Sequence, residues 1–268
     1  MNANHRGFAL IAVLWLITAL AAVVGLALAG GRLGALASRN RIVLTRGRWS
    51  AEACLAIVQA RWAQHQLSDT ATIDLGRTTA CSWRLEDPTA KLSVNSASRE
   101  ELLTALSPLS RHPSAVDSLV EMLLLLRRRG PLTDLGQINA LPGWEPPWAS
   151  ILTADGPGSV NASSAPAPVL AALPGMTPEA VEVIVSRRSI GRPVSSLDAL
   201  AGTLSPNARA ILLASYADLA REITFTAPQL LVTGDGWVGV ASEAPHATIQ
   251  LLVVPLPERL AVIRRRMW

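Results

Sequence analysis

Lysine and cysteine are nearly absent from this sequence, and the shortage of cysteine excludes a class of protein. Lys91 is the only lysine, so the net charge of +4 rests almost wholly on arginine. Arginine can bind phosphates or an anionic membrane surface, but these arginines are spread in short groups, which is also typical of a solvated basic surface. Two cysteines are too few for a disulfide-rich scaffold, and their spacing is not that of a zinc site.

Sequence patterns of catalysis and metal binding are also missing. Neither H-E-x-x-H nor G-x-S-x-G occurs. The four histidines lie far apart, at His5, His65, His112 and His246. Calcium needs a dense set of oxygen ligands, whereas the carboxylates are scattered, at Asp69, Asp74, Glu86, Asp87, Asp134 and Asp155. We therefore expect no enzyme, no cofactor and no metal site.

The longest apolar run lies near the N-terminus. No charged residue occurs from Phe8 to Gly31, and these 24 positions are enough for a helix to cross a bilayer. A buried core helix rarely needs so long a run. A cleaved secretory signal is the stronger alternative, since Ala27 and Ala29 resemble the small residues at its exit. We predict a single membrane-spanning helix.

The charges that flank this run oppose export of the rest of the chain. His5 and Arg6 precede it, whereas five arginines follow it closely: Arg32, Arg39, Arg41, Arg46 and Arg48. Loops that carry more positive charge usually stay in the cytoplasm. Counted this way, the bulk of the chain would be cytoplasmic.

The helix is expected to continue beyond the membrane. Residues 32–66 contain no proline and keep a broad apolar face, so one helix from Phe8 to Gln66 would be about 90 Å long. A weak hairpin pattern follows, with alternating residues on both sides of Gly76-Arg77. Cys54 would lie on the helix and Cys81 on the packed strand. They form either two buried thiols or, in an oxidising periplasm, one bridge worth about 3 kcal/mol.

The middle of the chain contains an internal repeat. Lys91 opens KLSVNSASREELLTAL and Gly158 opens GSVNASSAPAPVLAAL, and both copies lead into helices that end in arginines. The predicted helix caps are Asn95 and Ser96, then Asn161 and Ser163. The stretch ALPGMTPEAVEVIVSRR resembles a helix-hairpin-helix unit, which in other proteins binds DNA phosphates through a glycine loop. Here the loop has a single glycine, Gly175, and no lysine, so we expect a packing module and no nucleic-acid partner.

The C-terminal part is expected to be rich in strands. QLLVTGDGWVGVAS predicts two strands around a turn at Gly234-Asp235-Gly236. ATIQLLVVPL and RLAVIRRRMW predict two more strands, with Pro255 and Pro257 between them. These four strands would pack on the long helix.

The N-terminus resembles a type IV prepilin leader. A short polar stretch, MNANHRG, ends in Gly7 and the apolar helix begins at once. The resemblance implies that a prepilin peptidase cuts between Gly7 and Phe8, and that Phe8 is then N-methylated. Pilins carry a glutamate at the fifth mature position, where it is understood to pair with a neighbour's amine. Ala12 replaces it here, which implies a subunit with nothing above it.

Taken in order, the motifs resemble the K-type minor pseudopilins of type II secretion systems. They are RGFALIAVL without the glutamate, KLSVNSAS, DLGQINALPGW, SVNASSAPAPVLAALPGM and SSLDAL. The resemblance implies an α+β fold, in which a long pilin-like N-terminal helix packs on an antiparallel sheet and an all-α domain of two helix-hairpin-helix-like units is inserted. It implies a single-pass inner-membrane protein with a cytoplasmic N-terminus and a periplasmic bulk, at the tip of the pseudopilus. The implied partners are the I- and J-type minor pseudopilins, the prepilin peptidase, the secreted cargo and the outer-membrane secretin.

The expected organisation has six segments. They are the leader (1–7), the transmembrane helix (8–31), its periplasmic continuation (32–68), the first strands (69–92), the inserted helical domain (93–215) and the β-rich C-terminal part (216–268). Two other functions remain open. A membrane-anchored DNA receptor would need no β frame, and a minor pilin of a type IV pilus would more often keep the glutamate.

Overall fold

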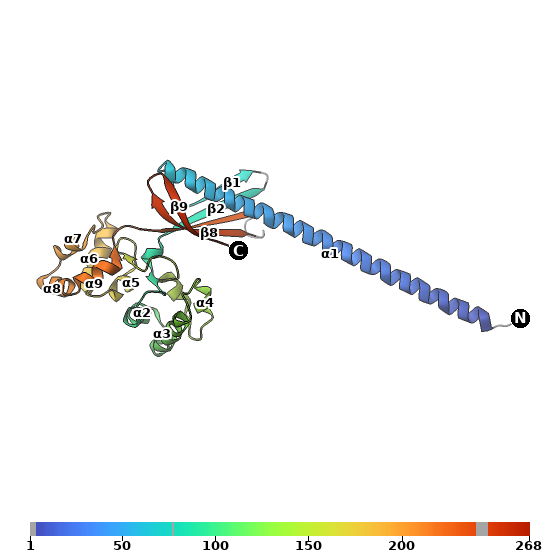
Figure 1. Cartoon of the computed structure of the whole chain (residues 1–268), viewed down its shortest axis with the longest axis horizontal. Helices are drawn as coiled ribbons and strands as arrows, with labels where there is room; N and C mark the ends of the chain where they lie inside the picture. Colours follow the sequence, from blue (N-terminus) through green and yellow to red (C-terminus); the bar gives the residue numbers. More distant parts are fainter. Residues whose placement is uncertain (1–3, 77, 240–245) are drawn as a thin grey trace.

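Helix α1 (Asn4–Ala63) is one continuous helix of 60 residues. It is about 90 Å long, and in Figure 1 it projects as a straight rod far beyond the rest of the molecule. It ends three residues before the expected Gln66, because His65 adopts a left-handed conformation (φ 55°) and the N–H of Gln66 bonds to the carbonyl of Arg61. This computed structural model describes residues 4–76, 78–239 and 246–268, with side chains from residue 12 onward.

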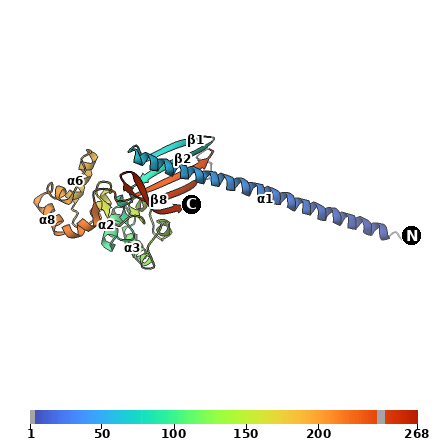
Figure 2. The ribbon, with the colours of Figure 1, turned by 45° about the horizontal axis from the view of Figure 1, so that its top comes forward.

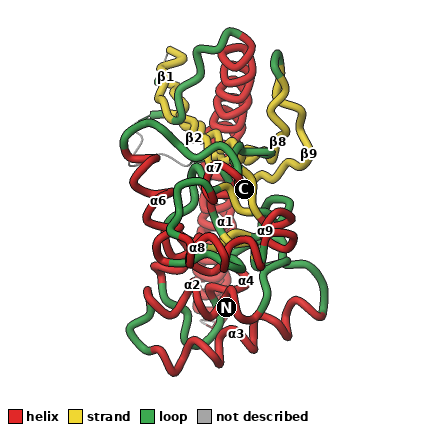
Figure 3. Tube along the Cα trace, turned by 90° about the vertical axis from the view of Figure 1, so that its left-hand side faces the viewer, coloured by secondary structure: helices red, strands yellow, loops and turns green. Residues whose placement is uncertain are grey.

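A five-stranded antiparallel sheet packs against the C-terminal third of α1. Its order is β1-β2-β7-β8-β9, and Figure 3 places the edge strands β1 and β9 on opposite sides of the helix. The strands are β1 (Thr70–Gly76), β2 (Thr79–Glu86), β7 (Leu230–Val238), β8 (Ala247–Leu256) and β9 (Arg259–Met267). The α+β fold and the first hairpin are confirmed; Arg77 of its turn lies outside the described residues.

The predicted turn at Gly234-Asp235-Gly236 is wrong. These three residues lie inside β7 and pair with β2 on one side and β8 on the other. The region therefore contributes three long strands to the sheet instead of four, and Pro255 lies within β8, opposite Leu260. Residues 240–242 of the predicted second strand lie outside the described residues.

The helical part consists of two units, each enclosed by a pair of short parallel strands. The first unit runs from β3 (Leu92–Ser93) through α2 (Arg99–Leu106), η2 (Ser107–Leu109), α3 (Pro113–Arg128), α4 (Gly136–Asn139) and η3 (Pro146–Ser150) to β4 (Leu152–Thr153). The second runs from β5 (Val160–Asn161) through α5 (Ala167–Ala172), α6 (Pro178–Ser189), α7 (Leu197–Ala201), α8 (Pro206–Ala214) and α9 (Tyr216–Glu222) to β6 (Ile223–Thr224). Figure 2 shows the two units side by side at the end of the sheet farthest from the N-terminus.

The end of the helical part lies later than expected. The expected boundary between residues 215 and 216 separates α8 from α9, but Leu219 and Ile223 are buried in the same hydrophobic core as the other helices. We therefore place the boundary after Thr224. A second, separate core lies between α1 and the sheet and contains Ala51, Cys54, Leu55, Val58, Cys81, Trp83, Val232, Ile249, Val253 and Leu260.

The two helical units have equivalent structures, but the residues that correspond are not those paired by the S-V-N match. The correspondence is shifted by two residues. The carbonyl of Ser93 accepts a hydrogen bond from the N–H of Ala97, and that of Asn161 accepts one from Ala165. Ser93 therefore corresponds to Asn161, not to Ser159. The short strands, which pair only through the backbone, set this register.

The predicted helix caps are also wrong. The first helix of unit one is capped by Ser98, in a capping box with Glu101, and the first helix of unit two begins after Pro166 without a side-chain cap. Asn95 is used elsewhere: its amide bonds to the carbonyls of Leu132 and Ala154. It thereby joins the two ends of its unit.

Candidate functional site: the exposed helix and its anchor in the sheet

The first part of α1 is uncovered by the rest of the chain. Every residue from 12 to 42 is exposed, including Ala12. Among the described residues, α1 is the one helix long and apolar enough to cross a membrane. Gly7 and Phe8 lie in its helical backbone, but their side chains are outside the described part, so cleavage and N-methylation stay predictions.

The C-terminal part of α1 lies unusually close to β7, and glycines make this possible. A Cβ atom on Gly236 would lie less than 3.0 Å from the backbone of Gly47 and Ala51. A Cβ on Gly234 would lie 3.2 Å from Leu55 Cδ2. Gly234 and Gly236, which were expected to form a turn, are therefore required because α1 packs so closely on β7.

A disulfide bond between Cys54 and Cys81 ties the helix to the sheet at the same place. Both side chains are fully buried, and the Cα atoms are 6.0 Å apart. Cys81 pairs directly with Gly236 in the sheet. The disulfide bond and the close glycine contact therefore fix the same part of α1 against the sheet.

Asp87, at the end of β2, connects the sheet to the second helical unit. Its Oδ1 accepts hydrogen bonds from the backbone and side chain of Thr89. Its Oδ2 accepts bonds from Asn161 Nδ2 at 2.7 Å and from Ser164 Oγ at 2.6 Å. One carboxylate therefore satisfies four donors from two parts of the fold. An aspartate directly before a proline is a common cap pattern, which is the one signal that could have identified it.

Asp155 forms a second connection, between the helical units and the last strand. Its side chain is buried and forms ion pairs with Arg264 and Arg266 of β9. Arg266 also bonds to the carbonyl of Thr133 and to the side chain of Gln250. A basic run in a terminal strand carries no local signal of such a partner, and sequence reasoning missed this contact.

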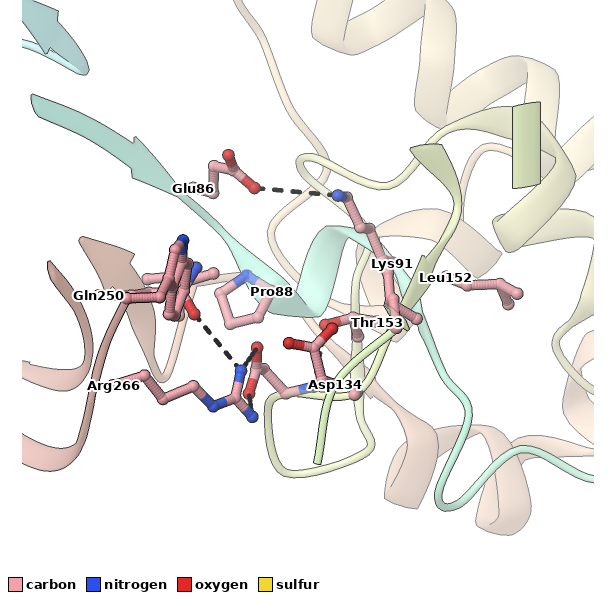
Figure 4. A pocket seen from close by; sticks show the side chains of 13 residues that line it. Glu86, Pro88, Lys91, Asp134, Leu152, Thr153, Gln250 and Arg266 are labelled. Carbon is pink, nitrogen blue, oxygen red and sulfur yellow. Dashed lines mark hydrogen bonds and ion pairs between the residues drawn. The ribbon is translucent and has the colours of Figure 1, made fainter. Parts of the chain in front are cut away.

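A cavity of about 220 Å³ lies at this junction, and several of its polar side chains bond to one another. Figure 4 shows Arg266 directed toward Gln250 and Lys91 directed toward Glu86. The ammonium of Lys91 is 3.8 Å from Glu86 and 3.5 Å from the carbonyl of Ala149. The only lysine of the chain thus links the sheet to the first helical unit, and the cavity lies at the junction between them.

The helix-hairpin-helix resemblance is explained by internal contacts. Gly175 has a positive φ (73°), and a Cβ atom there would lie 2.7 Å from the side chain of Ser215. Arg188 Nη1 donates to the carbonyl of Ala165 at 2.8 Å, just as Arg127 Nη1 donates to Ala97 at 2.7 Å in the first unit. One arginine at each helix end thus braces the start of its own unit. The loop glycine and these arginines need no DNA to account for them.

Two carboxyl groups meet where the helical units touch. Burial raises the pKa of Glu222 to about 7, and the nearby charge and hydrogen bond of Glu101 add to the effect. Glu101 cannot turn away easily, because it also accepts the N–H of Ser98 at 2.6 Å in the capping box. This pair makes the contact between the units sensitive to pH.

The structure does not bring the other candidate residues together. Within the described ranges, no group of three or more His, Cys, Asp or Glu side chains could hold a metal ion. Asp74 and Asp134 each accept a nearby backbone N–H, from Gly76 and Gly136. These two aspartates therefore close local turns.

Comparison with solved structures identifies a similar fold, whereas comparison with sequences does not. No protein-family profile and no curated protein matches the sequence. A chain in the crystal structure of the GspK-GspI-GspJ complex from the type 2 secretion system of enterotoxigenic Escherichia coli matches with a TM-score of 0.56 and 12% identity. The match covers 88% of this chain and 98% of that one. The fold is GspK-like.

This likeness confirms the predicted fold. The long helix, the antiparallel sheet and the further helices of this chain form an α+β fold, and the match extends over nearly the whole of the solved chain. The similar structure belongs to a secretion complex and not to an enzyme family. At 12% identity the likeness extends to the fold alone.

Proposed function

We propose that this chain is a minor pseudopilin of a type II secretion system. It spans the inner membrane once, with its N-terminus in the cytoplasm and its sheet and helical units in the periplasm. It sits at the tip of the pseudopilus, starts the assembly of the filament, and so supports protein secretion across the outer membrane.

The observation that carries the proposal is the combination of fold and helix. The fold is GspK-like, and α1 presents a continuous apolar surface that the chain itself leaves uncovered. An exposed apolar helix of this length is stable only in lipid or against other helices. A filament subunit anchored in a membrane is in contact with both lipid and the helices of neighbouring subunits.

Ala12 supports a place at the tip. A pilin glutamate inside the membrane is tolerated because the amine of a neighbouring subunit pairs with it. A subunit without the carboxylate cannot make this pairing with a subunit above it, and at the tip no such subunit exists. The partners proposed below it are the I- and J-type minor pseudopilins, which agrees with the composition of the similar complex.

Processing and secretion test the proposal. In the Gly7→Ala variant, the prepilin peptidase should no longer cleave before Phe8, so the chain should keep its leader and cargo should accumulate in the periplasm. Immunoblots of the chain and of a secreted cargo measure both effects. Normal export of cargo by the uncleaved variant would contradict the pseudopilin function.

A DNA receptor is the weaker candidate. Its main support was the glycine loop and the arginines of the second unit, and Gly175 and Arg188 have internal structural roles. Micromolar, salt-dependent binding of duplex DNA to the full chain would favour the receptor. A type IV minor pilin is distinguished by genetics, since its loss would abolish surface pili and leave cargo secretion unchanged.

A further inference from the structure

The segment of α1 just beyond the apolar run carries an unbalanced positive charge. No acidic residue precedes Glu52, whereas five arginines lie between residues 32 and 48. All five are exposed. Within the described residues, their side chains make no ion pair or hydrogen bond. The described part of the chain therefore gives these charges no such partner.

Three of the five large apolar residues between 32 and 46 lie at the a and d positions of a heptad that continues into the sheet contact, and the other two, Ile42 and Leu44, lie beside it at c and e. Counting Leu33 as position a, the a and d positions are Leu33, Leu36, Asn40, Val43, Gly47, Ser50, Cys54 and Ile57. From Gly47 onward this seam lies against the chain's own sheet. Before it, the same seam is open: Leu33 is 67% exposed and Leu36 is 57% exposed.

The arginines occupy two rows with different relations to this seam. Arg32, Arg39 and Arg46 are at successive g positions, directly beside the seam. Arg41 and Arg48 are at b positions, about 200° around the helix from the first row at about 100° per residue. In coiled coils, charges at g pair with charges at e of the partner helix and determine which partner binds and in which orientation.

We propose that residues 32–46 of α1 pack in parallel against a helix of another membrane-anchored subunit that carries carboxylates at its e positions. The inference rests on the proposed function, which supplies a neighbour anchored in the same direction. Asn40, the one polar residue at an a position in the open part of the seam, fixes the register of the pair. The arginines that oppose export by simple counting are thus contact residues for a partner.

Lipid headgroups are a less suitable partner for these arginines than a helix with carboxylates. The apolar run ends at Gly31, and Arg46 lies 15 residues later, about 22 Å along the axis. The headgroup layer on one side of a bilayer is only about 5–8 Å thick. The helix is straight (Figure 1), so only Arg32 reaches the headgroups while the apolar run stays in the membrane.

Two matched charge reversals test the inference. Arg39→Glu with Arg46→Glu reverses two g positions, and Arg41→Glu with Arg48→Glu reverses two b positions in the same segment. Both variants change the net charge and the flanking-charge count equally, and all four side chains are exposed. The probes are the full-length I- and J-type minor pseudopilins of the same genome, titrated against the full chain in detergent micelles, with helicity checked by circular dichroism.

The g variant should weaken binding to one of the two pseudopilins about tenfold, and the b variant less than twofold. Lysines at the e positions of that pseudopilin should restore binding to the g variant. Equal loss in both variants, or no loss in either, would overturn the inference and leave the proposed function standing. Equal loss together with weaker binding to vesicles of anionic phospholipid would assign the arginines to lipid. If the wild-type chain bound neither pseudopilin, the proposed function itself would fail.

Discussion

Gly236 is the residue at which the packing of α1 on the sheet can be tested most sharply. In Gly236→Ala the new Cβ would overlap backbone atoms of Gly47 and Ala51, which cannot rotate away as a side chain can. The helix or the strand must move, and overpacking of this kind costs about 1–3 kcal/mol. Alanine recovers roughly 0.5–1 kcal/mol of strand propensity. Because the overlapping atoms belong to the backbone, the cost lies at the upper end of this range, and we expect a net loss of about 2 kcal/mol.

Gly234→Ala is the matched control, because it makes the same change two residues away in the same strand. Its Cβ would meet mainly the flexible end of Leu55, at 3.2 Å, so the overlap and the gain in propensity should nearly cancel. Thermal unfolding of the full chain in detergent, with the disulfide intact, should place Gly236→Ala about 4–8 °C below the control. Equal melting temperatures for the two variants would refute the view that the glycines serve the approach of the helix.

Three other perturbations probe the bridge, the carboxyl pair and the membrane segment. Replacing both Cys54 and Cys81 with alanine should destabilise the chain by about 3 kcal/mol, because the unfolded chain regains the freedom of a 27-residue loop; denaturant unfolding measures it. The folded-state pKa of Glu222 is raised to about 7, so its contribution to stability is present below about pH 4.5 and lost as the pH rises through 7. Glu222→Gln should therefore be the more stable form at pH 8, by about 1 kcal/mol or less given the solvent screening of this group, and melting curves across pH measure it. Ala12→Glu should impair secretion, since the tip offers no amine to pair with a buried carboxylate.

Each of these has an outcome that contradicts it. An unchanged unfolding midpoint after removal of both cysteines would mean that the bridge adds nothing to the glycine contact. A melting temperature of Glu222→Gln that stays parallel to wild type from pH 5 to 8 would mean that the pKa of Glu222 is not raised in the folded chain. Secretion by Ala12→Glu at the wild-type level would contradict the place at the tip.

Local sequence was enough to predict the elements whose environment is uniform along their length. The uncharged run predicts the first part of α1, because the described rest of the chain leaves that part exposed and does not modify its requirement for internal backbone hydrogen bonds. Alternation predicts β1 and β2 because one face of each strand is buried and the other is not. The α+β class follows from these elements and their order.

Contacts between distant residues decided what local sequence misjudged. A pair of glycines around an aspartate predicts a turn when only neighbours are considered, yet Gly236 lies in mid-strand because Gly47, far away in sequence, passes over it. The S-V-N match predicts a register that the backbone pairing of β3 and β5 shifts by two residues. In both cases the residue type was read correctly, but its partner was not adjacent in the chain.

By itself, the sequence determined that this protein has an apolar anchor, a helical spine, two related helical units and a strand-rich end. Periodicity and composition are sufficient for these features, because they depend on each segment's own exposure to water or lipid. Only the tertiary structure decided that Asp155 holds β9, that Arg127 and Arg188 brace their own units, and that the five arginines between residues 32 and 48 make no ion pair or hydrogen bond within the described part of the chain. The energy of a charge depends on which charges lie within a few ångströms of it, and folding alone determines those neighbours.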